Sequence, residues 1–193
     1  MKREELKQAA LKYFTENGYE GTSLNQIAEE AGIKKSSIYA HFKGKDELFL
    51  EVLREAKDVE IRLKETYFQQ NDTSNVAAFL HGYLVNIVEM FQQYESLKFW
   101  LRMGFLPPVH LYKEVQQEVV EVEAFQERLL KKTFQQWMDK NAITSEENAE
   151  TITVAFTGMV MAIMVELAYF NTSDQVDKKL DALWKVFWRG ITI

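Results

Sequence analysis

Residues 31–45 contain four lysines and no acidic residue. Lys34 and Lys35 are followed directly by Ser36 and Ser37, so ammonium and hydroxyl donors are neighbours in the chain. Ammonium groups bind phosphates and the O6 and N7 atoms of guanine, and a serine hydroxyl can bond to any base. The pattern predicts a small surface that contacts nucleic acid, with these four side chains nearest the base edges.

Two short helices joined by a glycine turn are expected to position this surface. Ile27 and Ala28 give the first helix an apolar face, and Ile38 gives the second helix one. Gly32 lies between them, where a left-handed backbone is expected. The pattern is typical of a helix-turn-helix, whose second helix enters the major groove of DNA.

The ends of the neighbouring helices are predicted to hold phosphates. Thr22 or Ser23 is the expected N-cap of the first of the two short helices. Backbone N–H groups and a hydroxyl at such a position can hold one phosphate. Lys45 begins the next long helix and is predicted to bind a second phosphate.

Composition indicates an all-helical protein. The 193 residues include only two prolines and eight glycines, and long segments show helical apolar periodicity without strand-like alternation. Two domains are predicted, a helix-turn-helix domain over residues 1–45 and a helical effector-binding and dimerisation domain over residues 46–193. Further helices are expected over the following residues: 3–17, 46–67, 75–93, 96–104, 110–140, 146–170 and 174–191.

Charge is distributed unevenly along the chain, whose net charge is −6. Residues 1–50 hold eight basic and eight acidic residues, so the whole excess of negative charge lies in the remainder. DNA binding must therefore come from a local patch, and the acidic remainder is expected to repel non-specific DNA.

Several classes of chemistry find no support in the sequence. There is no cysteine, which excludes disulfides and thiolate metal sites. Nucleotide-binding glycine loops and nucleophile motifs are missing, and the three histidines are far apart. No catalytic residue, metal or cofactor is predicted. An enzyme and a helical adaptor that binds only protein remain the alternative classes.

The predicted setting is the cytoplasm, without a membrane. No signal peptide is visible at the N-terminus. The longest apolar stretch, residues 154–165, is shorter than the roughly 18 residues of a spanning helix.

The N-terminal quarter of the chain resembles the TetR family of bacterial transcriptional regulators. The residues that carry the resemblance are Phe14, Gly18, Tyr19, Gly21, Thr22, Ser23, Leu24, Ile27, Ala28, Ala31, Gly32, Ile33, Ser37, Ile38, Tyr39, His41, Phe42, Lys45 and Leu48. The resemblance implies that Tyr39 and His41 contact the DNA backbone. It also implies a homodimeric repressor that a small ligand releases from DNA. Departures from the usual pattern at Lys34, Ser36 and Ala40 leave the base preference open.

The resemblance further implies an effector pocket in the C-terminal domain. A hydrophobic or amphipathic ligand is expected, because methionine and aromatic side chains adapt to varied apolar molecules. The predicted lining residues are Tyr83, Ile87, Phe91, Trp100, Met103, Phe125, Phe156 and Met159. Arg102, His110 and Glu166 are candidate polar anchors. A plain hydrophobic core is the alternative for each apolar residue.

The last two helices are predicted to form an isologous dimer interface. The residues assigned to it are Ala155, Gly158, Ala162, Glu166, Leu180, Leu183 and Phe187. The alternative is that both helices are buried within one protomer. A dimer would match a two-fold-related double-stranded operator with half-sites about one helical turn apart, or a multiple of it.

Overall fold

The computed structural model describes residues 2–143, 145–169 and 173–192, which contain helices and no strand. The elements are α1 (Lys2–Asn17), α2 (Leu24–Glu30), α3 (Lys35–Ile38), α4 (Lys45–Gln70), α5 (Val76–Gln93), α6 (Glu95–Phe105), the 3₁₀ turn η1 (Val109–Leu111), α7 (Tyr112–Asp139), α8 (Ala149–Tyr169) and α9 (Ser173–Ile191). The predicted all-helical fold is confirmed.

Local signals set where several of these helices begin and end. Gly18 follows α1 with φ +70°, the left-handed conformation that glycine adopts at a helix C-terminus. Before α8, the side chain of Asn148 accepts a hydrogen bond from the Thr151 N–H at 2.9 Å and acts as the cap. In the sequence, Thr144 or Ser145 followed by Glu147 resembles a capping box and predicts a cap at one of these two residues. Thr144 lies outside the described residues, and α8 begins four residues after Ser145.

Contacts divide the chain into two compact units that differ from the predicted domains. The first unit comprises residues 1–62 and 92–121, and the second comprises residues 63–91 and 122–193. The division therefore passes through α4 and α7 and assigns α6 to the unit that contains α1, α2 and α3. The boundary at residue 45 stays a prediction about function.

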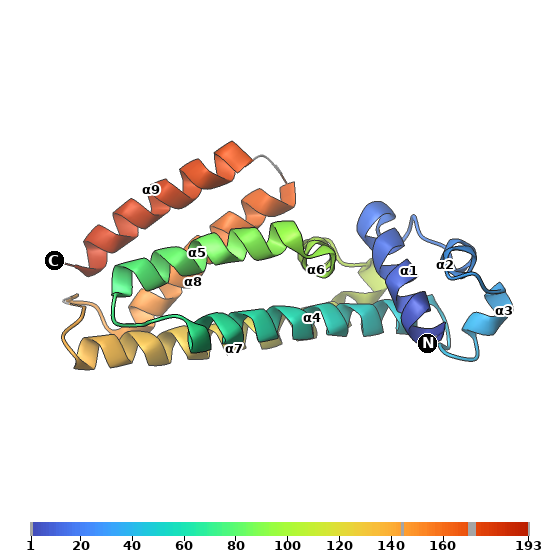
Figure 1. Cartoon of the computed structure of the whole chain (residues 1–193), viewed down its shortest axis with the longest axis horizontal. Helices are drawn as coiled ribbons and strands as arrows, with labels where there is room; N and C mark the ends of the chain where they lie inside the picture. The colour runs from blue at the N-terminus through green and yellow to red at the C-terminus, as the bar shows by residue number, and fades with distance from the viewer. Residues whose placement is uncertain (1, 144, 170–172, 193) are drawn as a thin grey trace. The chain divides into compact units, whose positions relative to one another are not determined.

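An aromatic cluster forms the core of the first unit and joins α1, α4 and α6, the helices labelled in Figure 1. Phe14 of α1 meets Phe49 of α4 edge to face with ring centroids 5.2 Å apart, and Phe49 meets Phe99 of α6 at 5.6 Å. All three rings are fully buried. Helix α1 packs on both α2 and α6, and α2 packs on α3. Phe99 of α6 thus supports the helices of the N-terminal segment.

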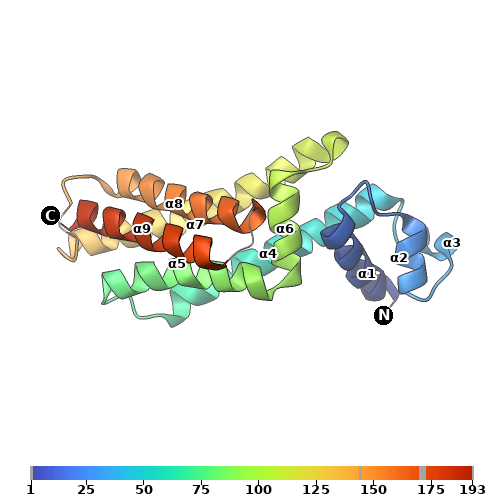
Figure 2. The same cartoon turned by 90° about the horizontal axis from the view of Figure 1, so that it is seen from above.

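The core of the second unit is built around Phe156 of α8. Its ring lies 5.9 Å from Phe134 of α7, 5.3 Å from Phe187 of α9 and 6.2 Å from Tyr83 of α5. Helices α8 and α9 pack against each other along their lengths (Figure 2). One ring therefore touches three neighbouring helices of this unit.

Helix α8 is apolar over a longer stretch than residues 154–165 alone. By length and composition, Ala149–Tyr169 is able to cross a membrane. Its face with Ile152, Phe156 and Ile163 is buried within the protein. Other apolar residues of α8 are exposed, including Val154 and Met161.

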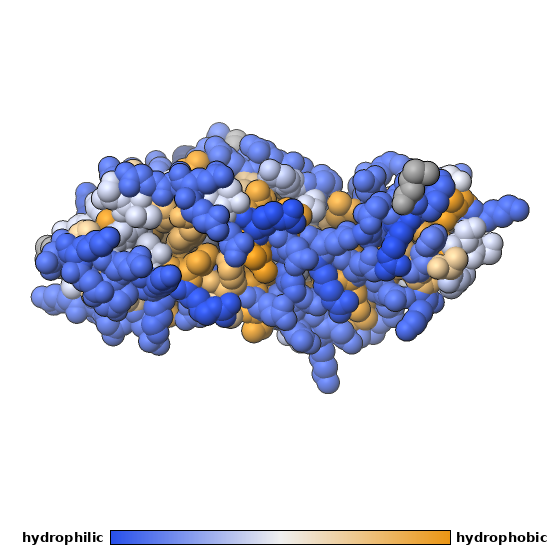
Figure 3. All heavy atoms as spheres, turned by 60° about the horizontal axis from the view of Figure 1, so that its bottom comes forward, coloured by the Kyte–Doolittle hydropathy of each residue, from blue (hydrophilic) through white to orange (hydrophobic). Residues whose placement is uncertain are grey.

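Apolar side chains also reach the surface elsewhere in the molecule. Hydrophilic residues cover most of the face in Figure 3, with apolar residues gathered in patches between them. Among the large exposed apolar residues are Leu106, Val109, Tyr112, Val120 and Val186. A partner helix is one way to cover the patch on α8.

Candidate nucleic-acid interface

Helices α2 and α3 are joined by a tight glycine turn. Gly32 has φ +65°, which an L side chain rarely adopts, so the expected left-handed backbone is present. The Ile33 N–H donates to the Ala28 carbonyl at 2.9 Å and closes the turn. Helix α3 then consists of a single turn, and its N-cap residue Lys34 is extended without a side-chain cap. The flanking segments must therefore fix the orientation of α3, because a single turn is not stable by itself.

The side chains predicted to meet base edges lie on the surface. Lys34, Lys35, Ser36 and Ser37 are all exposed. Within the described parts of the chain, none of these four side chains has an ion-pair or hydrogen-bond partner. We call them the reading edge. They are available to bind a ligand without breaking an internal contact.

Buried residues hold the reading edge in place from behind. Ile38 and Phe42 are fully buried, and the Phe42 N–H donates to the Ile38 carbonyl at 2.9 Å. Between them, Tyr39 is 56% exposed and Ala40 is exposed. Tyr39 therefore projects from the same short segment as the reading edge, as a DNA-backbone contact requires.

Thr22 does not occupy the position that the sequence suggested. It is only 2% exposed, and its hydroxyl donates to the carbonyls of Tyr13 at 3.0 Å and Gly18 at 2.8 Å. Its backbone N–H donates to the Tyr19 carbonyl. Both donors of Thr22 are engaged inside the domain, so the prediction that its hydroxyl holds a phosphate is corrected to a structural role.

Ser23, rather than Thr22, caps α2. Its hydroxyl accepts from the Gln26 N–H at 3.3 Å, and its own N–H donates to the Gln26 side-chain oxygen at 2.8 Å. This reciprocal pair is a capping box. The Ser-x-x-Gln spacing is visible in the sequence and could have predicted the role of Gln26. Ser23 is exposed and remains a candidate phosphate contact.

The ammonium group of Lys45 is mostly engaged within the first unit. It donates to the carbonyls of Tyr19 and Thr22, both at 2.9 Å, and lies 3.9 Å above the Tyr19 ring. An ammonium group has three N–H donors, so one remains for a phosphate. Lys45 therefore ties the turn before α2 to the start of α4, in addition to its predicted role.

Asp46 and His110 lie beside Tyr19, the residue whose ring and carbonyl Lys45 contacts. The Tyr19 hydroxyl donates to Asp46, and His110 Nε2 lies 3.4 Å from the same carboxylate. The hydrogen bond from Tyr19, followed by the contact with His110, lowers the pKa of Asp46. Burial, together with this bond, raises the pKa of Tyr19, so the phenol stays protonated. His110 thus contacts Asp46 within the first unit, and its role as a polar anchor for an effector stays a prediction.

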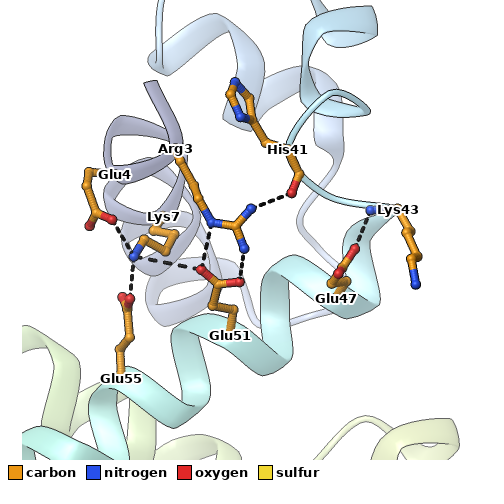
Figure 4. A network of polar contacts seen from close by, with 8 residues as sticks. All are labelled: Arg3, Glu4, Lys7, His41, Lys43, Glu47, Glu51 and Glu55. Atoms are coloured by element: carbon orange, nitrogen blue, oxygen red, sulfur yellow. Dashed lines mark hydrogen bonds and ion pairs between the residues drawn. The ribbon is translucent and has the colours of Figure 1, made fainter. Parts of the chain in front are cut away.

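Charged residues from α1 and α4 lie beside the turn that follows α3, at His41 and Lys43 (Figure 4). Arg3 Nη1 donates to the backbone carbonyl of His41 at 2.5 Å, while its other nitrogens bind Glu51. The Lys43 N–H donates to the carboxylate of Glu47. Arg3 and Glu51 are absent from the predicted site, because 48 positions separate them and no local motif connects them.

The predicted effector residues are divided between the two units. Trp100 and Met103 belong to the first unit and the other six to the second. All eight are buried except Phe125, which is half-buried. In the second unit, the buried Tyr83 hydroxyl donates to the Gln126 side-chain oxygen at 3.2 Å. A shared pocket for these residues stays a prediction.

The other two candidate anchors also have partners within the protein. Arg102 donates to the carbonyls of Thr15 at 2.5 Å and Glu16 at 3.2 Å, at the C-terminal end of α1. Glu166 is buried and binds Lys179 of α9. Arg102 therefore caps α1, where exposed carbonyls favour a cation.

The residues assigned to the dimer interface divide into exposed and internal groups. Ala155 and Gly158 are exposed on α8, and Ala162 is half-buried. Leu180 is buried, and Phe187 packs on Phe156. Leu183 is half-buried. Glu166, Leu180 and Phe187 thus stabilise the protomer, whereas the small residues of α8 are free to meet a partner.

The fold and this interface define a helical protein with an N-terminal helix-turn-helix. Residues 6–52 match the family model described as bacterial regulatory proteins, tetR family. The N-terminal helix-turn-helix is therefore that of the TetR family. The match includes Ser23, the reading edge, Tyr39, His41 and Lys45.

Sequence similarity to characterised regulators covers only part of the chain, for example 29% and 45% of it in two relatives. The chain is 46% identical over 57 residues to the HTH-type transcriptional regulator LmrA of Bacillus subtilis, which is 29% of this chain and 30% of that protein. Alignments with the first curated relatives span 27–40% of those proteins' own lengths.

Similarity of fold extends over the whole chain. The transcriptional regulator FadR from Bacillus subtilis, in complex with stearoyl-CoA, has a TM-score of 0.72 at 16% identity and covers 97% of this chain and 98% of its own. AibR, in complex with isovaleryl coenzyme A and operator DNA, has a TM-score of 0.68 at 15% identity, with coverages of 96% and 97%. At such identities the likeness concerns the fold alone.

Proposed function

We propose that this protein is a homodimeric transcriptional repressor that binds an operator in double-stranded DNA and that a small ligand releases. The observation that carries the proposal is the reading edge, which has exposed lysines and serines without internal partners among the described residues. Its setting in a helix-turn-helix of the TetR family supports the same function. The proposed location is the cytoplasm.

Helix α3 enters the major groove in this proposal. Lys34 and Lys35 donate to guanine O6 and N7, and the two serines bond to neighbouring base edges. Tyr39, His41, Ser23 and the remaining donor of Lys45 bind the DNA backbone and fix the register. Because Thr22 is buried, we leave it out of the contact surface.

A homodimer places two such surfaces on one DNA duplex. The exposed small residues Ala155 and Gly158 on α8 support a close approach of a second copy. The neighbouring exposed apolar residues Val154 and Met161 give that contact an apolar surface. Two-fold symmetry of the protein then requires a two-fold-related operator, with half-sites about 10 base pairs apart or a multiple.

The proposed effector is a hydrophobic or amphipathic molecule that binds the second unit. FadR, which shares the fold, was crystallised with stearoyl-CoA, a molecule with a long apolar chain. Among the described residues of α5, Asn86 has a buried side-chain oxygen without a hydrogen-bond partner. It lies near Tyr83 and Ile87 in the helix, so an effector that donates a hydrogen bond would satisfy it.

Two other classes are distinguishable from this proposal. We propose that the protein is not an enzyme, and no group of three or more metal-ligating side chains occurs in the described part of the chain. A helical adaptor that binds only protein would show no selective capture of DNA. The reading edge favours the DNA-binding class over both.

A gel-shift series at fixed salt tests the proposal with two variants. Tyr39→Ala is expected to weaken binding to all DNA sequences by a similar factor, because a backbone contact carries no sequence information. Lys35→Ala is expected to change the base preference by about 1–3 kcal/mol at the position it contacts. Unchanged affinity and selectivity in both variants would refute the assignment.

A further inference from the structure

The guanidinium group of Arg3 makes three hydrogen bonds, drawn in Figure 4, and also lies over an aromatic ring. Its Nε donates to Glu51 Oε1 at 3.0 Å, and its Nη2 donates to Glu51 Oε2. Its Nη1 donates to the backbone carbonyl of His41 at 2.5 Å. The guanidinium carbon lies 4.3 Å from the centre of the Phe42 ring. The planar guanidinium group thus connects the Glu51 carboxylate of α4 to the turn that follows α3.

The carbonyl that Arg3 holds belongs to the turn that ends α3. The N–H groups of His41 and Phe42 both donate to the Ile38 carbonyl, at 2.8 and 2.9 Å. Ile38 and Phe42 are buried, whereas Tyr39 between them is exposed. Since α3 is one turn long, a shift of this carbonyl would move Tyr39 and the reading edge together.

Arg3 itself is poorly suited to bind a phosphate. Its charge is paired with Glu51, and the hydrogen bond to that carboxylate raises the pKa of the guanidinium further. All three of its donor directions named above end on protein oxygens. Because three of its five N–H groups are engaged and its charge is paired, we expect an effect of Arg3 on DNA to pass through the turn.

We propose that Arg3 is a positioning residue for DNA binding, which acts by fixing the His41 carbonyl and thereby the orientation of α3. The inference rests on the proposed function, because it concerns the same DNA surface. Glu51 anchors the guanidinium group of Arg3. It holds the guanidinium in the plane from which Nη1 reaches the turn.

The attachment of α1 to α4 does not depend on Arg3 alone. Lys7 of α1 is buried and pairs with Glu55 of α4 and with Glu4 at 2.6 Å. Its ammonium also lies 3.8 Å from Glu51. The aromatic contact between Phe14 and Phe49 joins the same two helices. We therefore expect variants of Arg3 to fold.

The test measures the dissociation constant of a selected DNA duplex as a function of salt. Arg3→Ala is expected to weaken binding about tenfold, the effect of removing a charge-assisted hydrogen bond. The slope of log K against log salt should stay unchanged, because in this proposal Arg3 itself neutralises no phosphate and releases no counterion. Circular dichroism melting confirms that each variant is folded at the assay temperature.

Lys2→Ala is the matched control. It removes the same charge one residue away, and its only contact in the described structure is an exposed ion pair with Glu5. We expect its affinity to stay within about twofold of the unchanged protein.

Glu51→Ala separates positioning from charge. Removal of an acidic residue near DNA would tighten binding if only charge mattered. If Glu51 anchors Arg3, we expect Glu51→Ala to weaken DNA binding instead, by about the same factor as Arg3→Ala.

Each possible outcome decides the inference. Equal affinity of Arg3→Ala and the unchanged protein overturns it and leaves the proposed function standing. A slope reduced by about 0.9 would assign Arg3 a direct phosphate contact and overturn it as well. Tighter binding by Glu51→Ala overturns the anchoring role. Failure of the unchanged protein to select any DNA refutes the proposed function, and the inference with it.

Discussion

At the residue scale, Thr22 and Lys45 use most of their donors to fix the proposed DNA-binding surface, whereas Lys34 and Lys35 leave theirs free for a ligand. Thr22 gives its hydroxyl to two carbonyls, and Lys45 gives two of its three N–H groups to carbonyls. Lys34 and Lys35 have no ion-pair partner in the described structure. Thr22, before α2, and Lys45, at the start of α4, therefore mainly stabilise the fold.

A substitution at Thr22 tests this division of roles. Thr22→Val removes the buried hydroxyl while keeping the shape, and it leaves two carbonyls without their donor. We expect a loss of about 1–2 kcal/mol in the free energy of unfolding. DNA affinity should be unchanged at temperatures where the variant is folded.

Thermal melting and a gel shift with the same protein samples measure both quantities. Thr22→Ser keeps the hydroxyl and serves as the control. Full stability of Thr22→Val combined with weaker DNA binding would return Thr22 to the contact surface.

At the element scale, the helices followed from local signals, whereas the contacts between helices did not. Apolar periodicity, Gly18 and Gly32 placed α1, α2 and α3 within a few residues. The ion pair between Arg3 and Glu51 could not be predicted from the sequence, because no local spacing indicates that α1 packs against α4. For the same reason, the sequence did not show that Arg102 of α6 caps α1 or that Thr22 is buried.

An ion-pair cluster joins α4 to α7 in the first unit. Glu118 of α7 is nearly buried and binds Arg54, at 2.7 Å, and Lys57. Lys57 also pairs with Glu121 at 2.7 Å. Burial alone would raise the pKa of Glu118, but the hydrogen bonds from Lys57 and Arg54 outweigh burial and lower it.

The lowered pKa of Glu118 predicts a pH-dependent contribution to stability. The unfolded chain binds the proton more tightly than the folded chain, so the contribution is present above the unfolded pKa of about 4.3 and is lost as the pH falls through the folded pKa. At pH 7, Glu118→Gln should cost about 1–2 kcal/mol, between the values for surface and buried pairs. This corresponds to about 2–8 °C in melting temperature for a chain of this size.

Thermal melting between pH 7 and pH 3.5 measures the difference between the variant and the unchanged protein. The difference should shrink as the solution becomes more acidic. Glu123→Gln, at an exposed position of the same helix, is the control and should show no such trend. A difference that is constant with pH would contradict the role of the Glu118 charge.

At the scale of the whole molecule, a protein with a net charge of −6 must bind DNA through a small surface. Residues 51–193 carry the full excess of acidic residues, so we expect general attraction to DNA to be weak. In the proposed function, selectivity therefore depends on the reading edge. A dimer doubles that surface. Dimerisation and DNA affinity are therefore expected to be linked.

Gly158 offers a clean test of the dimer. A Cβ at this position would meet no atom within 4 Å in the protomer, so Gly158→Glu is expected to leave the protomer folded. Glutamate also favours a helix more than glycine does. In a close α8–α8 contact, however, its charge and size would separate the two copies.

Sedimentation velocity at micromolar concentration is the measurement. The unchanged protein and Gly158→Ala should sediment as dimers, and Gly158→Glu as a monomer. A monomeric unchanged protein, or a dimeric Gly158→Glu variant, would contradict the proposed interface.

Sequence-specific binding of DNA through the reading edge is best examined by selecting bound duplexes from a random DNA library. At fixed salt, the unchanged protein is predicted to enrich a two-fold-related sequence with half-sites about 10 base pairs apart, or a multiple. The double variant Lys34→Ala, Lys35→Ala should no longer enrich that sequence. Recovery of DNA with no enriched sequence, or the same enrichment by the double variant, would contradict recognition of DNA by these residues.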